Sequence, residues 1–304
     1  MPVSTSVHIT HCLQYIIALG PRSILDIGCG FGLWGFLCRE YLDVMEERVQ
    51  PEAWRIRIDG IELFEPYIQS HQRALYTNIT IGDIRELAPK VDQYELIIAG
   101  DVIEHLDKED GERVIEQLYE RATRALLVNI PLGDGWDHPE RHGNPGELHR
   151  SQWTPEDFLA YPNIAQMFEL PAGAYGSFFC PKDCTVEQRV EGLLQAADYA
   201  RSSGHVEKAL GLLQQGRELD PKHRDTILFL SDTLLAAARY PEAVHVLEEA
   251  VQRDREFHFA FLALARILKI LGRTDEARFY AQSLIDNSVV GEDVHRQARA
   301  VLES

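Results

Sequence analysis

The chain has 304 residues, of which 45% are hydrophobic and 26% charged, and this balance predicts a globular protein long enough for about two domains. It contains no run of about 18 apolar residues, and its N-terminus lacks the basic region of an export signal, so we expect neither membrane spanning nor export. The net charge is −18, of which residues 1–184 carry −14. Because nucleic-acid binding needs cationic surface, this acidity argues against nucleic acid as a partner.

The five cysteines are scattered and odd in number, which favours free thiols in a reduced, cytoplasmic setting. Cys180 and Cys184 form a C-x3-C pair, but no second pair completes a four-ligand zinc site. We therefore expect buried thiols here and not a metal centre.

Residues 1–184 alternate apolar strands with amphipathic helical stretches. Strands are expected over 23–28, 57–63, 78–82, 94–100 and 125–131. This alternation predicts an α/β domain with a parallel sheet wrapped by helices. In such sheets, ligands bind beyond the carboxyl ends of the strands, and the conspicuous acids of this region fall at those ends.

The first expected strand runs into a glycine-rich turn, SILDIGCGFGLWGF, residues 23–36. No lysine follows the glycines, so the turn is not an ATP-binding phosphate loop, and Gly28, Gly30 and Gly32 depart from the dinucleotide spacing G-x-G-x-x-G. Asp26, just before the turn, would repel a pyrophosphate but can accept hydrogen bonds from an ammonium group. The turn therefore predicts a cationic ligand.

The segment LDIGCGFG resembles the first motif, [DE]-x-G-x-G-x-G, of class I S-adenosylmethionine-dependent methyltransferases. The segments DGIELFEPYI, IGDIREL and YELIIAGDVIEHL resemble the later landmarks of this family in the same order, over residues 10–180. The resemblance implies a Rossmann-like sheet and S-adenosylmethionine as cofactor. It places Glu62 on the ribose hydroxyls, Asp83 on the adenine amino group, Ile84 on the adenine ring and Asp101 at the end of the fourth strand. The implied cofactor-binding residues are Asp26, Gly28, Gly30, Gly32, Glu62, Asp83, Ile84 and Asp101.

Several of these residues also have simpler structural interpretations. Glycines after a strand often only permit tight helix packing, and an aspartate after a glycine commonly caps a turn, as Asp83 would. Glu65 is an alternative to Glu62 for the ribose. In addition, the segment YLDVMEERVQPEAW lengthens the first crossover and separates Glu62 from the glycines more than is usual.

Two histidines are candidates for catalysis on the acceptor side. Methyl transfer from a sulfonium is an in-line displacement in which positioning supplies most of the rate, and a base is needed only for a hydroxyl or a protonated amine. His105 follows the fourth strand, and His149 lies in the long segment GDGWDHPERHGNPGELHRSQW, together with His138 and His142. A connection of this length is expected to cover the substrate.

Asp101, Glu104, His105 and His149 also form a pattern that resembles metal-assisted 2′-O-methyltransferases of small RNAs and ubiquinone O-methyltransferases. Here, however, Asp101 stands where those enzymes carry glutamate, and the sequence EHL after the fourth strand is widespread in metal-independent relatives. We therefore expect no metal.

The C-terminal part contains an internal repeat. The segments HVEKALGLLQQGRELDP, YPEAVHVLEEAVQRDR and RTDEARFYAQSLIDNS align at a spacing of 34 residues, which is the tetratricopeptide period. Residues 188–286 resemble three such repeats, and residues 291–304 are expected to form a closing helix. Only Pro221 matches the consensus proline, which Arg255 replaces in the second repeat. The aligned positions are Ala209, Ala243 and Ala277 in the second helices, Ala197, Ser231 and Ala265 in the first, and Gly204, Ala238 and Gly272 in the turns.

Together these features predict a methyltransferase domain, residues 1–184, followed by three tetratricopeptide repeats and a closing helix, residues 185–304. We expect methyl transfer to an unidentified acceptor, a small-molecule or sugar hydroxyl, with the repeats docking a protein partner. The segment GNPGELHRSQWTPEDF resembles uncharacterised bacterial methyltransferases, some of which accompany glycan or cell-surface biosynthesis. The alternatives are a protein methyltransferase whose repeats recruit the substrate, a metal-assisted 2′-O-methyltransferase, and a non-catalytic scaffold. The intact motif residues argue against the scaffold.

Overall fold

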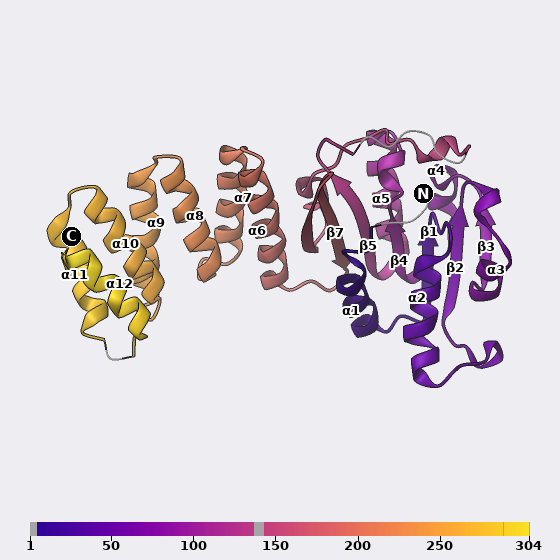
Figure 1. Ribbon diagram of the computed structural model, residues 1–304, viewed down its shortest axis with the longest axis horizontal. Coiled ribbons are helices and arrows are strands. Elements are labelled where there is room, and N and C mark those ends of the chain that lie inside the picture. The colour runs from indigo at the N-terminus through magenta and orange to yellow at the C-terminus, as the bar shows by residue number, and fades with distance from the viewer. Residues whose placement is uncertain (1–4, 137–142, 288, 304) are drawn as a thin grey trace. The chain divides into compact units, whose positions relative to one another are not determined.

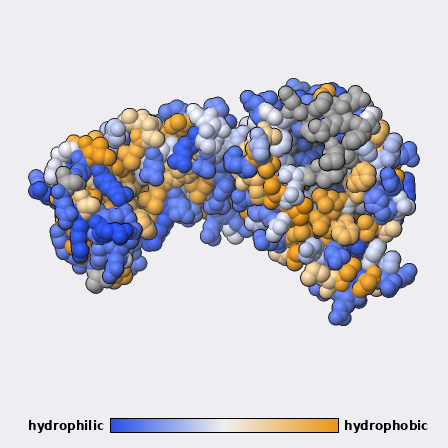
Figure 2. Space-filling model, in the orientation of Figure 1, coloured by the Kyte–Doolittle hydropathy of each residue, from blue (hydrophilic) through white to orange (hydrophobic). Residues whose placement is uncertain are grey.

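The computed structural model describes residues 5–136, 143–287 and 289–303. The chain forms two compact units, Met1–Gln188 and Arg189–Ser304, so the division falls four residues after the expected boundary and inside the first helix of the repeats (Figure 1). Each unit exposes hydrophilic residues with hydrophobic residues scattered among them (Figure 2). Among the described residues, no helix combines the length and the apolar character needed to cross a bilayer.

The first unit is built on a seven-stranded sheet with the order β3-β2-β1-β4-β5-β7-β6. Strands β1 to β5 pair in parallel, whereas β7 lies antiparallel between β5 and β6. We expected a parallel sheet, and the five expected strands do pair in parallel. The whole sheet is mixed because it also contains β6 and β7, two strands that the sequence pattern did not reveal. The strands are β1 (Ser23–Ile27), β2 (Arg57–Glu62), β3 (Asn78–Ile81), β4 (Tyr94–Gly100), β5 (Ala122–Leu132), β6 (Ile164–Leu170) and β7 (Gly173–Pro181).

Helices pack against this sheet and bury its apolar side chains. Residues Leu96–Ala99 of β4 are inaccessible to solvent, as is typical of a central parallel strand covered on both faces. One core cluster joins α1 and α2 to β1, β2, β4 and β5. The helices of this unit are α1 (Ile9–Leu19), α2 (Leu33–Leu42), α3 (Ser70–Leu75), α4 (Ile84–Leu87) and α5 (Lys108–Arg121).

The strand register brings the candidate residues to one edge of the sheet. Ile27 at the end of β1 pairs with Ile61 of β2 on one side and with Ala99 of β4 on the other. The residues that follow these positions, Gly28, Glu62 and Gly100, therefore lie at neighbouring carboxyl ends.

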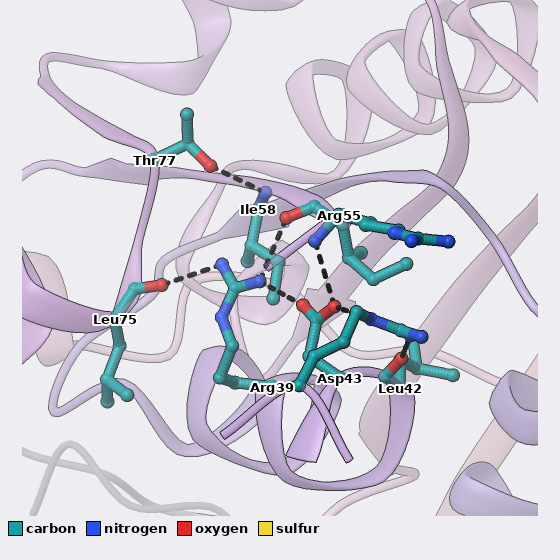
Figure 3. A network of polar contacts seen from close by, with 9 residues as sticks. Arg39, Leu42, Asp43, Arg55, Ile58, Leu75 and Thr77 are labelled. Carbon is teal, nitrogen blue, oxygen red and sulfur yellow. Dashed lines mark hydrogen bonds and ion pairs between the residues drawn. The ribbon is translucent and has the colours of Figure 1, made fainter. Parts of the chain in front are cut away.

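A buried ion pair holds the long crossover between α2 and β2 (Figure 3). Arg39 pairs with Asp43, and its guanidinium donates to the carbonyl oxygens of Ile56 and Leu75, each at 2.9 Å. Asp43 is inaccessible to solvent and accepts a hydrogen bond from the amide nitrogen of Arg55 at 2.9 Å. This network fixes both ends of the crossover and thereby the start of β2, although the connection is long.

The second unit is a succession of antiparallel helix pairs, as the 34-residue repeat predicts. Consecutive helices contact one another from α7 to α12. The helices are α6 (Val186–Ser202), α7 (Val206–Leu219), α8 (Arg224–Ala236), α9 (Tyr240–Arg253), α10 (His258–Ile270), α11 (Thr274–Ile285) and the closing helix α12 (Glu292–Glu303).

The predicted repeat register is confirmed in detail. The three turn residues Gly204, Ala238 and Gly272 all have left-handed backbone conformations, with φ of 81°, 57° and 74°. The small residues that were expected to face a partner helix are all buried, as are the aligned alanines of the second helices. Ala238 therefore adopts a conformation that favours glycine, which has a cost for a residue with a side chain.

Candidate functional site

A cavity of about 750 Å³ opens at the carboxyl ends of the parallel strands. This volume lies within the usual range for small-molecule and cofactor sites. Its walls come from the glycine turn after β1, the ends of β2 and β4, the start of α4 and the segment 144–150. The predicted site residues that line it are Gly28, Gly30, Gly32, Glu62, Asp83, Ile84, Asp101, His105 and His149.

The glycine turn is held against β2 by backbone hydrogen bonds. The amide nitrogens of Gly28 and Cys29 donate to the carbonyl oxygen of Ile61 at 2.8 and 3.1 Å. Gly28 has a φ of 65°, and a β-carbon at this position would lie 2.3 Å from Cγ2 of Val102. Only glycine fits here, because both the backbone conformation and the space exclude a side chain.

The third glycine of the motif has a packing explanation. A β-carbon on Gly32 would lie 3.1 Å from Cγ of Gln72 and 3.4 Å from Cε2 of Tyr76. The Tyr76 ring also occupies the space beside Gly35 and Gly60, where a β-carbon would lie 2.2 and 3.1 Å from it. Gly35 thus makes room for the tyrosine, whereas β-carbons on Gly32 and Gly60 would lie nearest to Cγ of Gln72 and Sγ of Cys29, at 3.1 and 2.9 Å.

Asp26 lies behind the turn and is not among the described residues that line the cavity. Its carboxyl group is 1% exposed, and the Tyr76 hydroxyl donates to its Oδ2 at 2.5 Å. Burial raises the pKa of Asp26 to about 7, an effect that the Tyr76 hydrogen bond opposes and the nearby Glu62 carboxyl reinforces. The contact observed is with Tyr76, and the direct contact with an ammonium group stays a prediction.

Glu62 is buried at the end of β2 and faces the cavity. Its Oε2 accepts a hydrogen bond from the amide nitrogen of Gly30 at 2.9 Å, and its Oε1 accepts one from Phe64 at 2.8 Å. Burial raises the pKa of this carboxyl group. Glu65, the alternative weighed from the sequence, is exposed and does not line the cavity.

Asp83 caps α4. Its carboxylate accepts hydrogen bonds from the Arg85 guanidinium at 2.5 and 3.0 Å and from the Arg85 amide nitrogen at 2.9 Å, and the hydrogen bond to Arg85 lowers its pKa. The capping interpretation therefore describes its observed contacts, while contact with an adenine stays a prediction. Ile84, the next residue, is buried against the same cavity wall.

Asp101 follows β4 in a left-handed conformation, with a φ of 52°. Its Oδ1 accepts a hydrogen bond from the Tyr175 hydroxyl at 2.9 Å, and its amide nitrogen donates to the carbonyl oxygen of Asn129 at 2.9 Å. These two hydrogen bonds hold Asp101 in a conformation that aspartate tolerates better than most residues.

Glu104, His105 and His149 form a cluster at the other end of the cavity. One ligating atom from each lies within 4.8 Å of the others, and the two imidazole rings lie 4.9 Å apart. Glu104 is 1% exposed, and its Oε2 has no hydrogen-bond partner among the described residues. Burial, with Asp101 and Glu147 nearby, raises the pKa of Glu104 well above its usual range. His138 and His142 lie outside the described residues.

The segment that carries His149 is fixed to the end of β4. The amide nitrogens of Arg150 and Ser151 donate to the carbonyl oxygen of Glu104 at 2.8 and 3.1 Å, and Nδ1 of His105 lies 3.2 Å from the carbonyl oxygen of Leu148. These bonds bring His149 to His105 although more than 40 residues separate them in the sequence.

The cavity residues that were not singled out from the sequence include Trp34, Tyr67, Glu147 and Tyr175. Trp34 is only two residues from the glycine motif, so its position could have indicated it. Tyr175 lies on β7, a strand that the pattern did not reveal, and Tyr67 and Glu147 meet only in the folded chain.

Comparison with protein-family models bears on the second unit. A tetratricopeptide repeat family model matches residues 200–260. No curated protein sequence matches the chain.

Three solved structures illustrate the likeness of fold. TehB from Haemophilus influenzae has a TM-score of 0.42 and 16% sequence identity to this chain. The match covers 59% of this chain and 64% of the length of TehB. Magnesium protoporphyrin IX methyltransferase (ChlM) from Synechocystis PCC 6803 with bound SAH has a TM-score of 0.41 and 16% identity, covering 58% of this chain and 82% of its own. The first TPR of Spaghetti (RPAP3) bound to an HSP90 peptide has a TM-score of 0.34 and 14% identity, covering 38% of this chain and 94% of its own.

Proposed function

We propose that this chain, with a class I methyltransferase fold in its first unit and tetratricopeptide repeats in its second, transfers a methyl group from S-adenosylmethionine to an acceptor. The observation that carries the proposal is the joint position of the glycine turn and Glu62. A buried carboxylate is hydrogen-bonded to the turn itself, at Gly30, and both line one cavity of cofactor size. Such a carboxylate suits hydroxyl and cationic groups and disfavours a pyrophosphate.

Each wall of the cavity would have a separate role in holding the cofactor. Glu62 would accept hydrogen bonds from the ribose hydroxyls, Ile84 would contact the adenine ring, and Asp83 would stand beside the adenine amino group. When bound, S-adenosylmethionine supplies a methyl group that is already activated on its sulfonium sulfur. The chain then has to hold the acceptor in line and exclude water.

On the acceptor side, we favour a small-molecule or sugar hydroxyl. Among the groups there, His149 and His105 would accept the hydroxyl proton, and a positioned histidine base contributes about 10² to 10⁴-fold. Hydrophobic residues such as Phe259, Ile270 and Phe279 are exposed on the repeat unit among hydrophilic ones, and such a mixed surface suits a protein partner. A protein acceptor recruited by the repeats is the corresponding alternative.

The cluster of Glu104, His105 and His149 favours one further candidate function, metal-assisted transfer. A carboxylate and two imidazoles within 4.8 Å of one another are a donor set that divalent transition metals accept, and a cation would stabilise the buried Glu104 carboxylate. These three residues would hold the ion, which would orient a hydroxyl acceptor and lower its pKa.

Titration calorimetry with S-adenosylhomocysteine tests the cofactor. We expect the wild-type chain to bind this ligand and to ignore NADH. Gly30→Val should abolish binding, and Glu62→Ala should weaken it about tenfold or more, because a charged hydrogen-bond acceptor is lost. Glu65→Ala, at an exposed glutamate outside the cavity, is the matched control and should bind as the wild type does. Binding of NADH without the homocysteine product would refute the proposal.

A chelator separates the two candidate mechanisms. With labelled S-adenosylmethionine and a cell extract as the source of acceptor, metal-assisted transfer should stop in EDTA and return with manganese or magnesium. Transfer that persists in EDTA but is lost in His149→Ala would support the metal-free base.

A further inference from the structure

Gln72 connects the glycine turn to the segment before α3. Its side chain is inaccessible to solvent, and its Nε2 donates to the carbonyl oxygens of Gly30 and Tyr67, each at 2.7 Å. Its Oε1 accepts a hydrogen bond from the amide nitrogen of Gln69 at 2.8 Å. The amide group is therefore fixed in one orientation, and the backbone at Gly30 and at Tyr67 cannot move apart without breaking a buried hydrogen bond.

Tyr67 continues this connection to the acceptor side of the cavity. Its hydroxyl donates to Oε1 of Glu147 at 2.9 Å, and both side chains are buried and line the cavity. Burial raises the pKa of Tyr67, and the Glu147 carboxylate acts in the same direction. The hydroxyl therefore stays protonated and is the hydrogen-bond donor to Glu147.

Glu147 lies in the segment 143–151, which bridges two sides of the cavity. On the β4 side, Arg150 and Ser151 are bonded to the carbonyl oxygen of Glu104. On the β2 side, the segment meets Tyr67, and Gly146 packs closely beside Leu63, whose Cδ2 would lie 3.1 Å from a β-carbon on Gly146. The position of this segment determines where Glu147 and His149 stand.

We propose that Tyr67 is a positioning residue that, with Gln72, links the cofactor turn to the segment 143–151, so that filling the cofactor half of the cavity orders the acceptor wall. A ligand that fixes the backbone at Gly30 also fixes Gln72, then Tyr67, and through its hydroxyl Glu147. The conformational entropy of the segment is thus lost when the cofactor binds and not when the acceptor binds. The acceptor therefore binds more tightly once the cofactor is present. This inference rests on the proposed function, because it takes the ligand of the turn to be the cofactor.

Hydrogen–deuterium exchange of the full chain, with S-adenosylhomocysteine as the probe, tests the link without knowledge of the acceptor. In the wild type, the ligand should slow exchange in peptides covering residues 143–151 about fivefold, the effect of stabilising about one hydrogen bond. In Tyr67→Phe, which keeps the ring and removes the hydroxyl, exchange in this segment should be the same without ligand and at a ligand concentration that saturates the variant in calorimetry. Gln72→Met should likewise lose the protection, because it removes the amide at similar size.

Tyr161→Phe is the matched control, since Tyr161 lies beside Tyr119 and outside the cavity. It should behave as the wild type does. Equal protection in Tyr67→Phe and the wild type would overturn the inference and indicate that the ligand touches the segment directly. Binding without protection in the wild type would also overturn it. A wild-type chain that does not bind S-adenosylhomocysteine would refute the proposed function itself.

Discussion

Replacing Asp26 by asparagine should change how the stability of the first unit depends on pH. The folded chain raises the pKa of Asp26 to about 7 from an ordinary value of 3.8, mainly because the carboxyl group is buried. The folded state thus binds this proton more tightly than the unfolded state. The stability associated with the protonated carboxyl is fully present below about pH 4 and is lost as the pH rises through about 7.

The size of the effect follows from the two pKa values. At about 1.36 kcal/mol per unit, the full loss is about 4 kcal/mol, of which about 3 kcal/mol falls between pH 5 and pH 8. In the Asp26→Asn variant, the side chain would keep an oxygen that can accept the Tyr76 hydroxyl but would not titrate. Any cost of burying its amide group is the same at both pH values and cancels in the comparison.

Urea unfolding followed by tryptophan fluorescence provides the measurement. All four tryptophans lie in the first unit, so the signal reports that unit separately from the repeats. We expect the wild type to lose about 3 kcal/mol more than Asp26→Asn between pH 5 and pH 8. Glu104 also has a raised pKa, but it is present in both proteins and cancels. Glu62 interacts electrostatically with Asp26, so removing the Asp26 charge lowers the pKa of Glu62 and adds to the expected difference in the same direction. Parallel pH profiles for the two proteins would refute the reasoning.

Three further substitutions test other parts of the molecule. Ala238→Gly should stabilise the repeat unit by about 0.5 to 1 kcal/mol in urea unfolding followed by circular dichroism, since the left-handed backbone costs alanine more than glycine, and a loss of stability would contradict this. Asp43→Asn should destabilise the first unit by about 3 to 5 kcal/mol by fluorescence, because the buried Arg39 loses its counter-charge, whereas Asp92→Asn, at an exposed ion pair, should cost less than about 1 kcal/mol. His149→Ala should leave the calorimetric affinity for S-adenosylhomocysteine within about threefold and lower labelled methyl transfer about 100-fold or more, and unchanged transfer would remove His149 from the catalytic groups.

The sequence was most informative where a local period or an ordered motif carries the structure. The spacing of Ala209, Ala243 and Ala277 predicted the helix pairs and the positions of the turns, because each repeat packs on the next in the same way. The apolar runs predicted five strands and placed Glu62, Asp83 and Asp101 beside one cavity, because parallel strands align their carboxyl ends.

What the sequence did not predict depends on contacts between distant residues. β7 returns antiparallel between β5 and β6, and nothing in its own residues specifies that direction. The partner of Asp26 is Tyr76, 50 positions away, and that of Tyr67 is Glu147, 80 positions away. Hydrogen bonds of this kind have no local pattern, so the bond between Tyr76 and Asp26 could not be predicted from the sequence.

The fit of Tyr76 against Gly32, Gly35 and Gly60 has a consequence for how related sequences can vary. These positions belong to α2, to β2 and to the turn between β1 and α2, yet one ring fills the space beside all three. A side chain at position 35 is sterically compatible only with a smaller residue at position 76, and loss of the tyrosine would also remove the hydroxyl that binds Asp26. Positions 35 and 76 should therefore change together among homologues, and a glycine conserved at position 35 would reflect the space that a tyrosine takes and not the binding of a ligand.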